Sequence, residues 1–234
     1  ETRVDRRGFR VKSPDVRDRL QEIGLAFVCG YHEALLESKP DTLGVVLQGA
    51  VATELEGFAF EGAAMGLALR DLLSPWKTNH LARFLDGAGA RHRYMVHVGA
   101  GWALARLHRR SGPFLERFDP LLRWLILDGY GFHQGYFHWP RYVDGRCLPG
   151  HLTGYGRRAF DQGLGRSLWF VEGADAQRIP ERIRTFDPGR HGDLWSGVGL
   201  AAAYAGGVDA ACLEDLGDAA GGFQPHLAQG AAFA

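Results

Sequence analysis

The stretch "YMVHVGAGWALARL", residues 94–107, decides how this chain is expected to fold. Its apolar residues recur with the spacing of an amphipathic helix, yet Gly99 and Gly101 lie in the middle of it. Each glycine costs a helix interior about 1 kcal/mol relative to alanine, because glycine loses more backbone entropy on folding. Two glycines in one turn therefore need a compensating contact, which a close approach of two helix backbones would supply.

Six other segments share this pattern, and their glycines recur at irregular spacings of 28 to 37 residues. The segments are "LAFVCGYHEALL", "FAFEGAAMGLAL", "YGFHQGYFHW", "RAFDQGLGRSLWF", "DLWSGVGLAAAY" and "HLAQGAAFA". The seven aligned glycines are Gly30, Gly62, Gly99, Gly135, Gly163, Gly197 and Gly230, with a mean spacing of about 33 residues. A repeat of this length is typical of αα-hairpins such as the tetratricopeptide unit. The glycines would then let the first helices of neighbouring hairpins pack closely.

The segments between the glycines are expected to form the second helix of each hairpin. A helix start signal, or a position after a glycine-containing turn, favours a second helix in residues 111–127, 175–186 and 208–216. Near the N-terminus, Ser13 is expected to cap a helix whose first residue is Pro14. Several glycines could instead lie in loops, above all in residues 127–135 and 149–156.

The sequence therefore predicts an all-α fold of αα-hairpin helical repeats, tetratricopeptide-like, in a single domain over residues 13–234. Residues 1–12 lack helical periodicity and are expected to form an extended arm. Strand patterns are scarce, which makes a parallel α/β sheet the weaker alternative. The array could be an open solenoid or a closed, distorted bundle. Because residue 234 falls inside an expected first helix, a C-terminal cap is expected to be missing.

Composition excludes several classes of protein. The 27 basic and 27 acidic residues cancel, whereas a nucleic-acid binder normally has a basic excess. No apolar run approaches the ~18 residues of a membrane span, and no signal peptide opens the sequence, so we expect a cytoplasmic protein without membrane contact. Cys29, Cys147 and Cys212 are too far apart for a disulfide framework or a zinc ribbon to be inferred.

Standard catalytic and cofactor motifs are absent from the sequence. No lysine follows a glycine, which rules out a phosphate-binding loop, and "GAGWAL" and "GLGRSL" lack the third glycine of a dinucleotide fingerprint. The sequence therefore predicts no cofactor. His97, His133, His138 and His151 could meet across stacked hairpins, but none of their spacings is that of a metal site. We predict no metal, and buried histidines bonded to the backbone are the alternative.

Aromatic and polar side chains alternate in the glycine segments. An apolar groove with a few polar groups is what a small-molecule or peptide site requires, whereas the alternative is that the aromatic residues are core between hairpins. The candidate ligand-binding residues are Glu61, Tyr94, His97, Trp102, His133, Gln134, Tyr136, Asp161, Gln162 and Trp195.

Five long motifs resemble those of one family. "GFAFEGAAMGLALRDLLSPW", "YMVHVGAGWALARL", "LRWLILDGYGFHQGYFHW", "RRAFDQGLGRSLWFVEGAD" and "DLWSGVGLAAAYAGGVD" are similar to motifs of an uncharacterised family of actinobacterial proteins, and the resemblance runs along nearly all of residues 8–234. Genes of that family lie in enediyne antibiotic biosynthetic clusters, beside the polyketide synthase that makes the enediyne core. The resemblance implies this context, but it carries over no catalytic residue and no fold.

The first hypothesis is an accessory protein that binds a small hydrophobic polyketide-derived intermediate or a biosynthetic partner protein. The alternatives are an enzyme that cyclises or rearranges this intermediate, self-resistance by sequestration of the enediyne, and a protein–protein scaffold. An enzyme would need a general acid or base, and Glu61 and His133 are the candidates. The sequence leaves these functions open.

Overall fold

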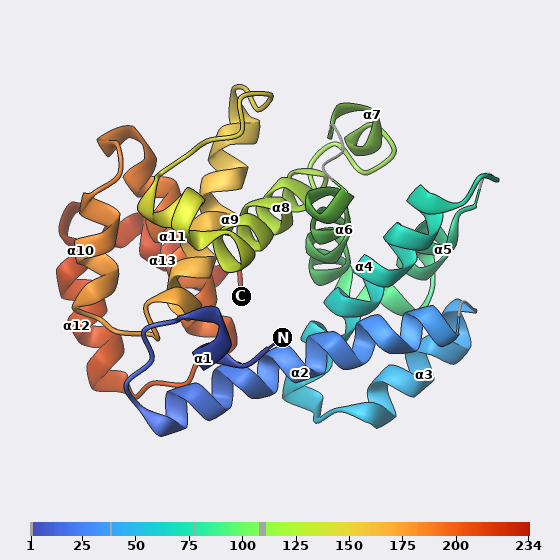
Figure 1. Cartoon of the computed structure of the whole chain (residues 1–234), viewed down its shortest axis with the longest axis horizontal. Coiled ribbons are helices and arrows are strands. Elements are labelled where there is room, and N and C mark those ends of the chain that lie inside the picture. Colours follow the sequence, from blue (N-terminus) through green and yellow to red (C-terminus); the bar gives the residue numbers. More distant parts are fainter. Residues whose placement is uncertain (1, 38, 77, 108–110) are drawn as a thin grey trace. The chain divides into compact units, whose positions relative to one another are not determined.

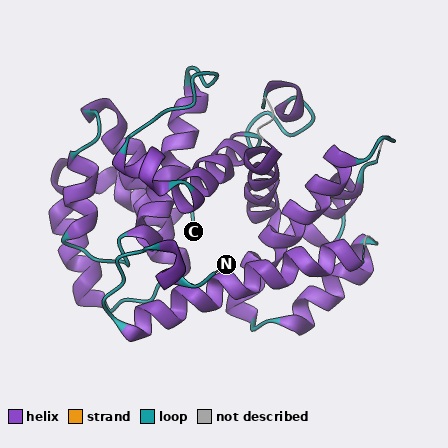
Figure 2. Ribbon diagram, viewed as in Figure 1, coloured by secondary structure: helices purple, strands orange, loops and turns teal. Residues whose placement is uncertain are grey.

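The computed structural model describes residues 2–37, 39–76, 78–107 and 111–234, and these residues form helices joined by loops (Figure 2). They contain no strand, so the prediction of an all-α protein is confirmed. The α-helices, labelled in Figure 1, are α1 (Val4–Arg7), α2 (Pro14–Leu36), α3 (Pro40–Ala50), α4 (Glu56–Leu73), α5 (His80–Asp86), α6 (Arg93–Leu107), α7 (Gly112–Leu115), α8 (Trp124–Phe137), α9 (Tyr155–Val171), α10 (Arg178–Arg184), α11 (His191–Ala205), α12 (Ala210–Ala220) and α13 (Gln224–Ala232). Short turns of 3-10 helix (Thr53–Leu55, Ala88–His92, Pro188–Arg190 and Gly221–Phe223) and one π-helical turn (Pro140–Asp144) lie between them.

The helices form two compact units. One unit consists of residues 22–130, and the other of residues 1–21 together with 131–234. The boundaries fall inside α2 and α8, so each of these two helices contributes a part to both units. The single repeat domain expected for residues 13–234 stays a prediction.

In the 22–130 unit, glycines bring the backbones of α2 and α4 into contact. A Cβ atom built on Gly30 would lie 1.8 Å from the carbonyl oxygen of Ala59, and one built on Gly62 would lie 1.9 Å from that of Phe27. No real side chain tolerates such distances. Only glycine is compatible with this packing, and the close approach brings Cα–H groups against carbonyl oxygens at the interface.

The two glycines of the opening stretch face two different neighbours. A Cβ on Gly99 would lie 2.0 Å from the Glu61 carbonyl oxygen on α4, and one on Gly101 would lie 2.0 Å from the Ile126 carbonyl oxygen on α8. Residues two apart on an α-helix point about 200° from each other, because each residue turns the helix by about 100°. A Gly-x-Gly pair therefore lets one helix contact a neighbour on each side, which explains why the sequence accepts two glycines in one turn.

The unit that contains residues 131–234 repeats this arrangement. A Cβ atom built on any of five glycines would lie too close to a backbone carbonyl oxygen of another helix. The pairs are Gly131 with Phe160 at 2.1 Å, Gly165 with Leu194 at 2.1 Å, Gly197 with Gln162 at 1.9 Å, Gly199 with Leu227 at 2.0 Å, and Gly230 with Ser196 at 1.8 Å. These contacts join α8 to α9, α9 to α11, and α11 to α13. Backbone contact between successive glycine-bearing helices is thus common to both units.

The expected alignment of α8 on Gly135 is out of register. Gly62, Gly99, Gly197 and Gly230 each face a carbonyl oxygen of the preceding glycine-bearing helix, and the glycine of α8 that does so is Gly129, whose Cβ would lie 2.0 Å from the Val98 carbonyl oxygen on α6. A Cβ on Gly135 would instead meet the Ser167 hydroxyl, at 1.9 Å. Three glycines close together in "DGYGFHQG" made the choice ambiguous, because the sequence does not show which one faces a backbone.

The helices between the glycine-bearing ones agree only in part with expectation. Residues 178–184 and 210–220 form α10 and α12, but residues 111–127 hold only the one-turn α7 and the start of α8. Pro120 disfavours helical geometry at Asp119, whose side chain accepts hydrogen bonds from the backbone N–H groups of Leu121 and Leu122. Residues 127–135 are helical, whereas residues 149–154 precede α9 without forming a helix. Tetratricopeptide-like hairpins remain a prediction.

The N-terminal segment is not extended throughout. Val4–Arg7 form the single turn α1, which ends at Gly8 with a φ of 71°. The side chains of Val4 and Phe9 are buried, so the segment packs against its unit. The cap at the start of α2 is as expected, because the backbone N–H of Val16 donates to the Ser13 hydroxyl.

Candidate functional site

Four of the ten candidate residues lie in the 22–130 unit. Glu61 is buried on α4, and His97 and Trp102 are buried on α6. The contact of Gly99 with the Glu61 carbonyl oxygen packs the two helices against each other. The Trp102 ring lies 4.3 Å from the Phe27 ring, which places it in the core of this unit. Tyr94, at the start of α6, is 45% exposed.

His97 presents a buried hydrogen-bond acceptor. Its Nδ1 atom lies 2.6 Å from the Arg93 carbonyl oxygen, and because a carbonyl oxygen can only accept, Nδ1 carries the proton. Burial lowers the pKa of His97, so the ring is neutral near pH 7 and Nε2 has a free lone pair. No described protein group donates to this Nε2 atom. The ring packs edge-on against Phe118, at 5.5 Å.

The other six candidates lie in the second unit, on α8 (His133, Gln134, Tyr136), on α9 (Asp161, Gln162) and on α11 (Trp195). His133, Gln134, Tyr136, Asp161 and Trp195 are buried, whereas Gln162 is half-buried. The Gln162 backbone carbonyl contacts Gly197, so this residue takes part in helix packing.

Tyr136 is the centre of an aromatic cluster. Its ring lies 4.9 Å from Phe9, 5.8 Å from Phe132, 5.1 Å from Phe137 and 5.8 Å from Phe170. Burial in these apolar surroundings raises the pKa of Tyr136 to about 12, although the charge of Arg7 opposes the shift. The hydroxyl is therefore a proton donor at all physiological pH values.

Gln134 and His133 lie on α8 between Phe132 and Tyr136 of this cluster. The Gln134 side chain is 3% exposed, and its Oε1 atom has no hydrogen-bond partner among the described residues. The His133 ring lies 4.7 Å from Phe137 and 6.0 Å from His138. On α8, aromatic rings and the polar side chains of His133 and Gln134 are therefore buried next to one another.

Asp161 forms a structural ion pair. Its two carboxylate oxygens accept from Arg190 Nε at 3.0 Å and from Arg190 NH2 at 2.5 Å, and Arg190 NH1 donates to the Arg146 carbonyl oxygen at 2.8 Å. Burial raises the pKa of Asp161 despite this arginine. Arg146 has a φ of 54°, so the pair holds a strained turn in place. These contacts give Asp161 a structural role within its unit.

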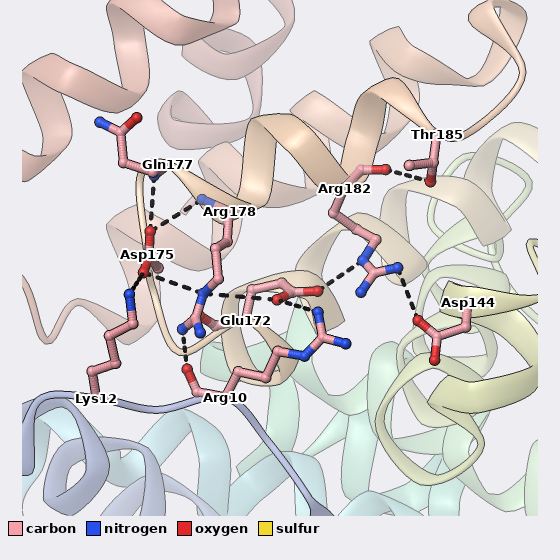
Figure 3. Close-up of polar contacts among 9 residues, drawn as sticks. All are labelled: Arg10, Lys12, Asp144, Glu172, Asp175, Gln177, Arg178, Arg182 and Thr185. Atoms are coloured by element: carbon pink, nitrogen blue, oxygen red, sulfur yellow. Dashed lines mark hydrogen bonds and ion pairs between the residues drawn. The ribbon is translucent and has the colours of Figure 1, made fainter.

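The most extensive charged cluster was missed by sequence reasoning. Glu172, 1% exposed at the C-terminal end of α9, pairs with Arg182 at 2.8 Å, Arg10 at 3.4 Å and Arg178 at 3.9 Å (Figure 3). Arg182 also pairs with Asp144, at 2.8 Å. A carboxylate buried among three arginines is strongly held, and its loss would remove one partner from each of them, although Arg182 would still pair with Asp144 and Arg178 with Asp175.

Part of this cluster comes from residues 1–12, the segment expected to form an extended arm. Lys12 pairs with Asp175 at 3.4 Å, next to the pair of Arg10 with Glu172 (Figure 3). Asp175 also accepts from the backbone N–H groups at the start of α10, and although burial alone would raise its pKa, these hydrogen bonds lower it. The partners are more than 160 residues apart in the sequence, a separation that no local pattern reveals.

An open cleft of about 610 Å³ lies beside this cluster, within the second unit. Its lining combines both charges with small and apolar residues: Lys12, Ser13, Asp15, Val16, Gly173, Ala174, Asp175, Arg178, Gly207, Val208, Asp209 and Cys212. None of the ten candidate residues lines it. The thiol of Cys212 lies 3.7 Å from the Ala174 carbonyl oxygen, and burial raises the pKa of this thiol.

The described residues hold neither a metal-binding cluster nor a membrane span. Among them, no group of three or more histidine, cysteine, aspartate or glutamate side chains has an arrangement that could hold a metal ion. No helix in the described part of the chain is both long and apolar enough to cross a membrane.

The chain belongs to the family described as "Protein of unknown function (DUF1702)", whose model matches residues 1–234. No curated protein and no solved structure matches the chain. The family match carries no residue roles.

Proposed function

We propose that this protein is an accessory protein of enediyne biosynthesis that binds a hydrophobic polyketide-derived intermediate. The biosynthetic context rests on the five long motifs, which resemble those of an actinobacterial family encoded beside the polyketide synthase. All five motifs contain residues of the glycine-bearing helices on which the buried candidate side chains lie, from Glu61 on α4 to Trp195 on α11.

Two buried acceptor atoms carry the binding part of the proposal. His97 Nε2 and Gln134 Oε1 are both acceptors, their side chains are 2% and 3% exposed, and neither has a protein donor among the described residues. A buried polar atom left without a partner costs about 1–3 kcal/mol. Interiors that bind ligands contain such atoms because the ligand supplies the partner. The expected ligand is apolar with at least one O–H or N–H donor.

We further propose that the glycine-bearing helices are the first helices of tetratricopeptide-like hairpins. The shorter helices α3, α5, α10 and α12 follow α2, α4, α9 and α11 in the chain, which supports this reading. Within each unit, the aromatic side chains on the first helices would then form the apolar walls around the buried acceptor atom.

Native mass spectrometry of the full chain, before and after incubation with an extract of an enediyne-producing strain, tests the proposal. We expect a retained small-molecule mass that is lost when Gln134→Met is used in place of the wild type. Methionine has a similar volume but its thioether sulfur is only a weak acceptor, so affinity should fall about tenfold if a bond worth about 1.4 kcal/mol is lost. Chromatography of the released compound distinguishes a binder from an enzyme, which would return a changed compound.

The same variant provides an independent readout in the absence of ligand. Gln134→Met removes an unsatisfied buried acceptor, so it should raise the melting temperature while it weakens binding. No retained mass, together with a stable complex with a synthase component, would contradict small-molecule binding and favour a partner enzyme. Equal ligand retention by wild type and variant would remove Gln134 from the site.

A further inference from the structure

The N-terminal residues Val4–Lys12, called here the strap, cover the aromatic cluster around Tyr136. Phe9 of the strap is 8% exposed and packs edge-on against the Tyr136 ring, at 4.9 Å and 84°. The Arg7 guanidinium lies 4.3 Å from the centre of the Phe137 ring, a cation–π distance. One aromatic and one cationic side chain of the strap thus pack on Tyr136 and Phe137, the part of the cluster that adjoins Phe132 and Phe170.

Besides the buried Val4 side chain, the strap makes several polar contacts. The Trp139 indole donates to the Arg7 carbonyl oxygen at 2.9 Å, and the Arg10 N–H donates to the Val171 carbonyl oxygen at 2.9 Å. The Arg10 carbonyl oxygen accepts from the Arg178 guanidinium. The side chains of Arg10 and Lys12 are 45% and 78% exposed while they pair with Glu172 and Asp175.

These contacts are of the kind that allow a segment to open locally. Lys12 and Arg10 reach their partners from exposed positions, and salt screens the more exposed pair, that of Lys12 with Asp175. A terminal segment whose buried apolar side chains are Val4 and Phe9 opens at a lower free energy than the core. Opening would uncover the Tyr136 and Phe137 rings beside Phe132 and Phe170, and exposed apolar patches of this kind are typical of binding surfaces. The strap therefore resembles a ligand that is covalently part of the chain.

We propose that the strap is a displaceable internal ligand, and that the surface formed by Phe132, Tyr136, Phe137 and Phe170 binds an apolar, ring-bearing or polyene ligand in place of Phe9. That the natural occupant is a polyketide-derived intermediate rests on the proposed function. Competition between the strap and an apolar compound does not depend on it. While the strap is closed, ligand affinity is reduced by the fraction of molecules that are open.

Binding of the neutral apolar dye Nile red to the full-length chain and its variants tests the proposal. Phe9→Ala should increase the affinity for the dye about tenfold, because the open fraction limits binding to the wild type. Arg10→Gln, which leaves every aromatic residue in place, should act in the same direction. Phe223→Ala is the matched control, because Phe223 is half-buried in the same unit against His191 and His226, away from these rings.

A synthetic peptide of residues 2–13, added to the Phe9→Ala variant, should displace the dye, whereas the same peptide with alanine in place of Phe9 should not. Equal dye affinity in the wild type and both strap variants would overturn the proposal. So would an equal increase in Phe223→Ala, or displacement by both peptides, since either result indicates a loosened core. Displacement by the natural peptide, combined with no ligand retained from the strain extract, would contradict the proposed function alone.

Discussion

At Gly101 a Cβ atom would lie 2.0 Å from the Ile126 carbonyl oxygen, whereas at Gly217 a Cβ would meet no atom within 4 Å. Both residues lie inside helices, so both carry the same intrinsic cost of about 1 kcal/mol relative to alanine. Only at Gly101 does a backbone contact offset that cost. The surroundings of each glycine therefore determine whether its replacement by alanine raises or lowers the stability of the protein.

We predict opposite effects for alanine at these two positions. Gly101→Ala should destabilise the protein by about 3 kcal/mol or more, because a carbonyl oxygen belonging to a helix backbone cannot move aside as a side-chain end can. Gly217→Ala should stabilise it by about 0.5–1 kcal/mol, because alanine loses less entropy. Urea unfolding of the two variants measures both effects. A loss of stability in both would mean that glycine is required throughout the helices for another reason.

Among single elements, α5 begins with a cap that comes from the preceding helix. The carboxylate of Asp71, near the end of α4, accepts from the backbone N–H groups of His80 and Leu81 at 3.0 Å and lies 2.8 Å from His80 Nδ1. Burial alone would raise the pKa of Asp71, but these hydrogen bonds outweigh burial and hold it below its usual value of 3.8. Asp71 therefore joins the end of α4 to the start of α5.

Asp71→Ala should destabilise the protein by about 1–2 kcal/mol near neutral pH, as the loss of a helix cap does. Since the pKa of Asp71 is lower in the folded state, its contribution is present in full above about pH 3.8 and is lost as the pH falls through the folded-state value. Unfolding midpoints of wild type and variant, measured at pH 7 and in acid, should converge in acid. Asp86→Ala, on the exposed side of α5, is the control and should change stability by less than about 0.5 kcal/mol.

The helices themselves could be predicted from the sequence better than the contacts that each helix makes with other segments. The glycine pairs revealed the all-α class and the close packing, because a Gly-x-Gly pair inside an amphipathic pattern is costly unless helix backbones meet there. The register of α8 was wrong, since three glycines compete there. The cluster around Glu172 was missed because Arg10 and Lys12 reach partners more than 160 residues away. Of the candidate site, the burial of His97 and Gln134 follows from their helical positions, whereas their unpartnered atoms are visible only in the structure.

For the whole molecule, the two units share two continuous helices. Residues 14–21 of α2 belong to one unit and residues 22–36 to the other, and α8 is divided in the same way after Tyr130. Unfolding one unit alone would require two helices to break inside their hydrogen-bonded ladders. Because helix formation is cooperative, such breaks are unfavourable and the units should unfold together.

Differential scanning calorimetry of two glycine variants tests this coupling. Gly99→Ala places a Cβ against Glu61 in one unit, and Gly197→Ala places one against Gln162 in the other. Each variant should lower the temperature of a single transition, by roughly 2–4 °C for each kcal/mol lost in a chain of this size. Two transitions, each moved by only one of the variants, would contradict the coupling. In that case α2 and α8 can lose their helical hydrogen bonds at the unit boundaries, and a ligand bound in one unit would stabilise that unit alone.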